Sequence, residues 1–237
     1  NWLDNEEKQA LKAMIDRERE HAAIVPASPR STLREVLTPA VLMYTLAYFC
    51  LTNTLSAINI WTPQILQSFN TGSSNIVIGM LAAIPQFCTI FGMIWWSRRS
   101  DRRKERKMHT ILPYLFAAAG WLLASATHHA LIQLIGIIMA SVGSFTAMAI
   151  FWTTPDRVIS LQSRAVALAV INAIGNIGSA VSPLLIGILR DATGSFSSGL
   201  WFVAGLLVVG ALVLTRIPMS AREDAAAEAG LAAQKSH

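Results

Sequence analysis

The sequence predicts an all-α integral membrane protein built as a six-helix bundle, and three observations lead to this fold class. Charged residues make up only 14% of the chain, whereas soluble domains carry about 25%. Charges are absent from four long stretches: 62 residues from Val36 to Ser97, 48 from Met108 to Pro155, 25 from Ala165 to Leu189 and 24 from Ala192 to Thr215. Basic residues are concentrated in some of the gaps between these stretches and scarce in others.

The length of each stretch sets the number of spans. A helix needs about 20 apolar residues to cross a hydrocarbon core of roughly 30 Å, so the first two stretches are long enough for two crossings each. A polar turn around Gly72 divides the first stretch, and His128-His129 divides the second. Helices are expected because membrane-spanning strands are about 10 residues long and alternate in polarity. The predicted spans are 40–66, 76–97, 110–127, 130–153, 165–188 and 197–216.

The distribution of Lys and Arg predicts the orientation. Six spans place both ends on one side, together with the 97–109 and 154–164 loops, and this side holds 18 of the 19 basic residues. The opposite side has only Arg190. Cytoplasmic loops are enriched in Lys and Arg, so both ends are predicted to be cytoplasmic. The net charge of +5 therefore indicates membrane orientation and not nucleic-acid binding.

The composition divides the chain into three parts. Residues 1–35 are predicted to be a cytoplasmic segment with a short amphipathic helix, because Asp4 and Glu7 fit a capping box. Residues 36–216 form the bundle, and residues 217–237, rich in Ala and Glu, are predicted to be a disordered cytoplasmic tail. Because the chain opens with Asn1 on a segment typical of a domain-connecting loop, we expect a fragment of a longer protein.

No predicted span contains a charged residue before its last position, where the sixth has Arg216. Ionisable groups inside a membrane usually mark ion or proton pathways, so this segment alone is expected to lack a proton-carrying carboxylate. Cys50 and Cys88 show no metal-ligand spacing, and they are interpreted as small apolar residues. We therefore expect no metal, no cofactor and no enzymatic activity, and neutral polar or aromatic side chains remain as the candidates for binding.

The fifth span has the clearest polar face. Asn172, Asn176 and Ser179 recur at helical spacing, and Pro183 continues the face and is expected to kink the span. Gly175 belongs to a small-residue pattern that lets helices pack closely. The asparagines are candidates for substrate binding; the alternative is that they only hydrogen-bond to neighbouring helices.

Aromatic residues supply the other candidates. Tyr48, within the first span, contacts either a substrate or a neighbouring helix. Trp152, near the cytoplasmic end of the fourth span, is a candidate for the binding site or an interfacial anchor. Four further aromatic residues are predicted to form an interfacial belt or face lipid: Trp95, Trp96, Tyr114 and Trp121.

The basic loop between the second and third spans is the candidate conformational switch. Its charged residues Asp101, Arg102, Glu105 and Arg106 either retain the loop in the cytoplasm or form a latch between helices. A latch would pair Asp101 with an Arg or a helix N-terminus, and the arginines with acidic groups or helix C-terminal carbonyls. Such contacts would form in one conformation and break in another.

The same loop resembles the major facilitator signature G-x-x-x-D-R-x-G-R-R/K, with Asp101, Arg102 and Arg106 in place. Other segments are similar to the anion:cation symporter branch, which includes permeases for tartrate, phthalate and hydroxyphenylacetate. The departures from the loop signature are Ser97, Lys104 and Glu105. The similar segments are 2–8, 79–85, 100–109, 151–152, 169–178, 182–183 and 191–196.

This resemblance implies that the spans are helices seven to twelve of a twelve-helix transporter. It also implies that the proton-binding carboxylates and the anion-pairing Arg belong to the missing N-terminal half. Trp152 and Asn172 match substrate-contacting positions, and Tyr48 is a weaker match. The implied function is proton-coupled symport of a small organic anion across the inner membrane. Thr62, at a position that is usually Leu in the branch, leaves the substrate open.

Two other functions remain open at this point. One is a proton-driven exporter of drugs or metabolites, and the other is a six-helix scaffold or sensor subunit that works alone. Sequence upstream of Asn1 would separate them, because a subunit working alone needs no partner half. For all three functions the lipid bilayer is a partner. The symporter and the exporter would also need a small-molecule substrate, protons and the missing N-terminal six-helix half.

Overall fold

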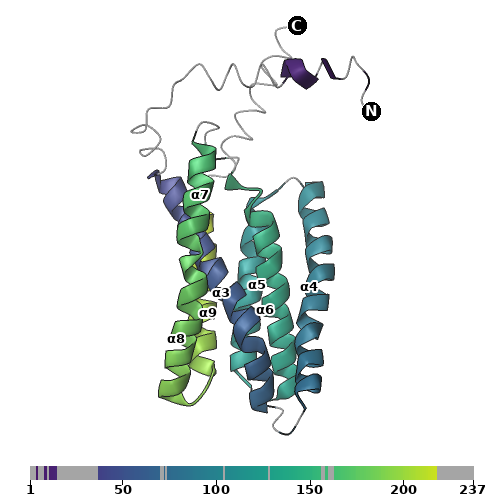
Figure 1. Ribbon diagram of the computed structural model, residues 1–237, viewed down its shortest axis with the longest axis vertical. Coiled ribbons are helices and arrows are strands. Elements are labelled where there is room, and N and C mark those ends of the chain that lie inside the picture. The colour runs from purple at the N-terminus through teal and green to yellow at the C-terminus, as the bar shows by residue number, and fades with distance from the viewer. Residues whose placement is uncertain are drawn as a thin grey trace.

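In a computed structural model, the described part of the chain forms a bundle of long helices that lie side by side (Figure 1). Six stretches of it are long and apolar enough to cross a membrane. They confirm the predicted all-α fold class and the number of spans. The structure describes residues 4, 8–9, 11–14, 37–69, 72, 74–103, 105–127, 129–155, 158–159 and 163–217.

The central helix of the bundle is α3, which packs against α6, α7, α8 and α9. Helix α4 packs mainly against α6 and lies at one side of the bundle in Figure 1, while α7 and α8 lie at the opposite side. α7 and α8 together form one span, interrupted at Asn176. The helices are α3 (Pro39–Phe69), α4 (Asn75–Arg103), α5 (Lys107–Ser125), α6 (Ala130–Phe151), α7 (Arg164–Gly175), α8 (Ile177–Thr193) and α9 (Ser197–Arg216).

Glycines bring α5 and α6 into direct backbone contact. A Cβ atom added to Gly136 would lie 2.6 Å from the Ala124 nitrogen and 2.7 Å from the Gly120 oxygen. A Cβ atom added to Gly143 would lie 2.6 Å from the Pro113 oxygen. Small residues at helix interfaces allow this approach in membranes, where packing and not water exclusion drives helix association.

A proline inside α5 shows how the bundle satisfies its backbone. Pro113 has no N–H, so the carbonyl of His109, four residues earlier, loses its helical partner. The Trp96 indole Nε1 of α4 donates to that carbonyl at 2.9 Å. In lipid, no water can replace such a bond, so the neighbouring helix supplies it.

The connection between α4 and α5 is shorter than predicted. Helix α4 runs on to Arg103 and α5 begins at Lys107, so most of the predicted 97–109 loop is helical. Arg is a good helix former, and cations are favourable in the last turn of a helix. The charges therefore mark the end of the membrane span and not the end of the helix.

The predicted lipid-facing position of two aromatic residues is wrong. Tyr114 and Trp121 are fully buried. The Tyr114 hydroxyl donates to the Ala47 carbonyl at 3.0 Å, and the Trp121 indole donates to Thr54 Oγ1 at 2.7 Å. Both side chains therefore tie α5 to α3 inside the bundle.

The predicted end segments fall largely outside the described residues. Within the predicted amphipathic helix, residues 8–9 and 11–14 are helical, and the Lys8 amide donates to the Asp4 carbonyl at 3.0 Å. The predicted tail lies outside the described residues from position 218 onward.

Candidate functional site

Two predicted binding residues from different helices are in direct contact. Tyr48 on α3 and Trp152, which ends α6, have ring centroids 4.9 Å apart in an edge-on arrangement. Phe151 stacks on Tyr48 with centroids 5.3 Å apart. Tyr48 is 3% exposed, whereas Trp152 is half-buried. Trp152 is therefore the outer member of an aromatic cluster packed on α3.

Two asparagines stand at the interruption between α7 and α8. Asn176 Nδ2 donates to Asn172 Oδ1 at 2.6 Å and to the Asn172 carbonyl at 2.9 Å. The Ser179 amide donates to the Asn176 carbonyl, three residues back, at 3.0 Å. Both asparagines are exposed, and the Tyr48 side chain is in polar contact with Asn176. The four predicted residues thus form one cluster.

Hydroxyl groups of α3 hold the interrupted span in place. Thr52 Oγ1 donates to the Gly175 carbonyl at 2.6 Å, directly before the interruption. Ser56 Oγ donates to the Ser179 carbonyl at 2.7 Å. Pro183 lies four residues after Ser179 and has no N–H for that carbonyl. The α3 hydroxyls therefore satisfy carbonyls at the interruption and at the proline.

The chemistry available to this cluster is neutral. Asparagine amides and the Tyr48 hydroxyl can donate hydrogen bonds to an oxygen-rich ligand, and the Trp152 ring offers an apolar wall. The cluster has no ionisable carboxylate, Lys or Arg that could neutralise a charged ligand or carry a proton. It can orient a ligand, and a counter-charge has to come from elsewhere.

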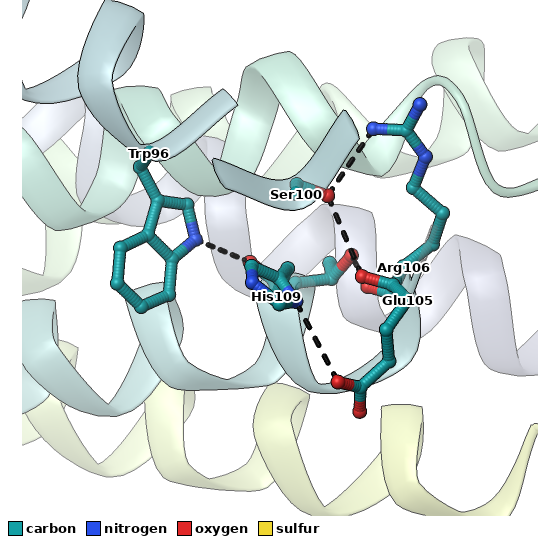
Figure 2. A network of polar contacts seen from close by, with 6 residues as sticks. Trp96, Ser100, Glu105, Arg106 and His109 are labelled. Atoms are coloured by element: carbon teal, nitrogen blue, oxygen red, sulfur yellow. Dashed lines mark hydrogen bonds and ion pairs between the residues drawn. The ribbon is translucent and has the colours of Figure 1, made fainter. Parts of the chain in front are cut away.

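The predicted switch residues lie where α4 ends and α5 begins. Arg106 Nη2 pairs with Asp101 Oδ1 at 2.6 Å, and Arg106 Nη1 donates to Ser100 Oγ at 3.2 Å. The Ser100 hydroxyl donates to the Glu105 carbonyl at 3.5 Å (Figure 2). The Asp101 side chain is 61% exposed, so the pair is solvated and contributes at most about 1 kcal/mol.

A buried histidine extends this network. Figure 2 shows the His109 ring beside Glu105, with Nδ1 and Oε2 at 3.9 Å. The ring centroid of His109 lies 5.3 Å from that of Trp96, and His109 is 4% exposed. Arg102, also predicted to belong to the switch, has no ion pair among the described residues. The structure therefore brings together Asp101, Glu105 and Arg106 but not Arg102.

Comparison with known proteins identifies the family. A sequence profile of the major facilitator superfamily matches residues 2–183. This chain belongs to the major facilitator superfamily. Two proteins of Agrobacterium vitis, provisionally named as tartrate transporters, are 34% identical over 212 and 223 residues, which is 90% and 94% of this chain. A quinolone resistance transporter of Acinetobacter baumannii is 33% identical over 217 residues, 91% of this chain.

The major facilitator chain spans about half the length of the curated relatives it matches. The matches cover 46% and 50% of the two Agrobacterium proteins and 49% of the Acinetobacter protein. Six candidate spans in the described residues agree with half of a major facilitator fold. These relatives are named as transporters.

One polar contact inside this major facilitator bundle was missed by the sequence analysis. Thr54 Oγ1 lies 3.3 Å from Ser144 Oγ and also accepts the bond from Trp121. All three side chains are fully buried. Nothing in the sequence indicated that the Thr54 and Ser144 hydroxyl groups meet, because both spans contain several other Ser and Thr residues.

Proposed function

We propose that this chain is the C-terminal half, helices seven to twelve, of an inner-membrane symporter for a small organic anion and protons. The half-length match and the provisional tartrate names of two relatives support this proposal. Because the spans here carry no charge, the N-terminal half would supply the proton-binding carboxylates and the anion's counter-charge. The two halves would rock about a site between them to give alternating access.

The observation that carries the proposal is the exposed pair Asn172 and Asn176 beside Tyr48 and Trp152. Asn172 Oδ1 already accepts a bond from Asn176 at 2.6 Å, so the Asn172 Nδ2 group remains to donate to a carboxylate oxygen. Neutral donors orient an anion without adding a charge that would have to be desolvated in each cycle. Trp152 would limit the size of the substrate.

The proposed orientation places both ends of the segment in the cytoplasm. In this orientation the Asp101–Arg106 pair lies at the cytoplasmic end of the bundle and acts as a latch that forms in one access state. Single cysteines introduced at Gly72 and Arg103 test the orientation. Membrane-impermeant reagents should label them from opposite faces, and labelling from the same face would contradict both the topology and the function.

Uptake of a labelled dicarboxylate such as tartrate tests the function. In the intact protein reconstituted in vesicles with an inward proton gradient, Asn172→Ala should lower uptake by about tenfold or more, because a lost bond to a charged group costs about 1.5–3 kcal/mol. Membrane insertion should be unchanged, because the Asn172 side chain is exposed.

Asn59→Ala is the matched control for this experiment. Asn59 is also an exposed asparagine within a span, but among the described residues its side chain bonds only to the Leu55 carbonyl of its own helix, at 2.9 Å. This variant should transport normally. Normal uptake by Asn172→Ala would remove Asn172 from the site, and equal loss in both variants would indicate a general effect on the membrane helices.

The quinolone resistance relative favours a second candidate function, a proton-driven exporter. The same vesicles distinguish the two functions by the direction in which the substrate moves. With the inward proton gradient, a symporter would accumulate the dicarboxylate inside the vesicle, whereas an exporter would move a quinolone out of the vesicle. Movement of the quinolone alone would replace the first proposal with the second.

A further inference from the structure

Helix α4 presents an apolar cavity and a cluster of arginines side by side. The apolar cavity, of about 510 Å³, lies between α4, α5 and α6, and Trp95, Leu112, Leu115 and Phe116 are among the residues that line it. A second cavity of about 590 Å³ lies at the end of α4. Trp95 lines both cavities, so they adjoin. The arginines that line the second cavity are Arg98, Arg99, Arg102 and Arg103.

The four arginines are available for an external anion. They form two pairs four positions apart, Arg98 with Arg102 and Arg99 with Arg103, which places them on one side of α4. Among the described residues, no carboxylate pairs with any of them, and the nearby Asp101 is engaged by Arg106. The Arg99 guanidinium lies 5.9 Å from the Trp95 ring centroid, which holds this cation at the boundary between the cavities.

The apolar part of this surface is open. Only 17% of the spanning window of α4 is buried within the bundle, compared with 67% for α3. Phe91 and Trp95 are 72% and 62% exposed, and Phe116 across the groove is 45% exposed. A surface that is apolar within the span and cationic at its end matches a phospholipid, which is apolar along its chains and anionic at its headgroup.

We propose that α4 and α5 bind an anionic phospholipid, with an acyl chain in the 510 Å³ cavity and the phosphate headgroup on Arg98, Arg99, Arg102 and Arg103. Basic pockets between membrane helices on the cytoplasmic side bind such headgroups. This inference goes beyond the proposed transport function and does not depend on the substrate. It needs that α4 spans the bilayer with its arginine end at the surface, and that the N-terminal half leaves this face of α4 and α5 uncovered.

Native mass spectrometry of the intact purified protein, titrated with phosphatidylglycerol or with phosphatidylcholine of the same acyl chains, tests the proposal. Phosphatidylglycerol should be retained at concentrations at least about tenfold lower, because each Arg near the surface contributes about fivefold. Arg99→Gln should weaken its binding by about fivefold. Removing all four arginines should abolish the preference between the two lipids.

Two variants separate a built site from general attraction to a basic surface. Arg216→Gln removes one charge from the last turn of α9, at the same end of the bundle, and should leave binding unchanged. Leu115→Trp fills the groove without a change of charge and should weaken the binding of both lipids. The proposal is overturned if the wild type shows no preference, as it would if another segment covers the groove. It is also overturned if Arg216→Gln acts like Arg99→Gln, or if Leu115→Trp has no effect.

Discussion

Glycines allow close helix packing at two places in the bundle: between α5 and α6, and between α3 and the α7–α8 span. The two contacts differ in the atoms that face the glycines. At Gly120 and Gly136, an added Cβ atom would meet the backbone of the facing helix on both sides. At Gly178, it would meet the Phe49 carbonyl oxygen and, at 2.6 Å, the Thr52 hydroxyl. The first contact is backbone against backbone at the glycines, with one side-chain bond, from Gln133 Nε2 to the Ala124 carbonyl at 3.1 Å, near the end of α5. The second adds hydroxyl-to-carbonyl bonds beside a helix interruption.

This difference separates a part of the bundle that fixes the fold from a part that can rearrange. Side-chain hydrogen bonds between membrane helices are worth about 0.6 kcal/mol on average, so they can exchange at little cost. Close backbone packing is lost all at once, because cores are not continuously deformable. The exposed Asn172 and Asn176 lie beside the second contact. We therefore expect conformational change and substrate binding there, and rigidity between α5 and α6.

The largest effect is expected from Gly136→Ala. The new methyl would lie 2.6 Å from the Ala124 nitrogen and 2.7 Å from the Gly120 oxygen, with no flexible side chain to move aside. Overpacking of this kind costs about 3 kcal/mol, so the protein should unfold at a lower temperature in detergent. Gly205→Ala on α9 is the control, because nothing lies within 4 Å of its added Cβ. Equal stability of the two variants would show that α5 and α6 are not in backbone contact.

Gly178→Ala should lower stability by a similar amount and have a larger effect on transport. The nearest atom to its added Cβ is the backbone oxygen of Phe49, and the Thr52 hydroxyl follows at 2.6 Å. A cost of about 3 kcal/mol is expected. Because the α3–α8 contact is expected to change during transport, uptake per folded molecule should also fall, whereas Gly136→Ala should lower the amount of folded protein only. The same pattern in both variants would remove the distinction between the two contacts.

The fold was largely predictable because the bilayer imposes length and charge rules on each span. The starts of the last two spans, predicted at residues 165 and 197, lie within one residue of Arg164 and Ser197. The burial of Tyr114 and Trp121 was not predictable. Lipid is as apolar as the bundle interior, so hydrophobicity alone does not tell an inward face from an outward one.

The residues of the candidate site were predictable from the sequence, but the position of the helix interruption beside them was not. Helical spacing placed Asn172 and Asn176 on one face, and the structure agrees. The interruption, however, lies at Asn176, while α8 continues through Pro183. The carbonyl that Pro183 leaves free is satisfied by Ser56, 123 positions away from Ser179 in the sequence. Such a distant partner cannot be read from local sequence, although it satisfies the carbonyl that Pro183 leaves free while α8 continues.

The smallest expected effect isolates the hydroxyl bonds themselves. Thr52→Val keeps the shape of the side chain but removes the 2.6 Å bond to the Gly175 carbonyl, at a cost of about 1 kcal/mol. Thr45→Val is the matched control on the same helix, because within the described part of the chain the Thr45 hydroxyl bonds only to the Val41 carbonyl of α3, at 2.8 Å. If the α3–α7–α8 contact rearranges during transport, Thr52→Val should change the uptake rate while Thr45→Val does not. Identical uptake by both variants would mean that the hydroxyl bond only satisfies the backbone and does not control the motion of the α7–α8 span.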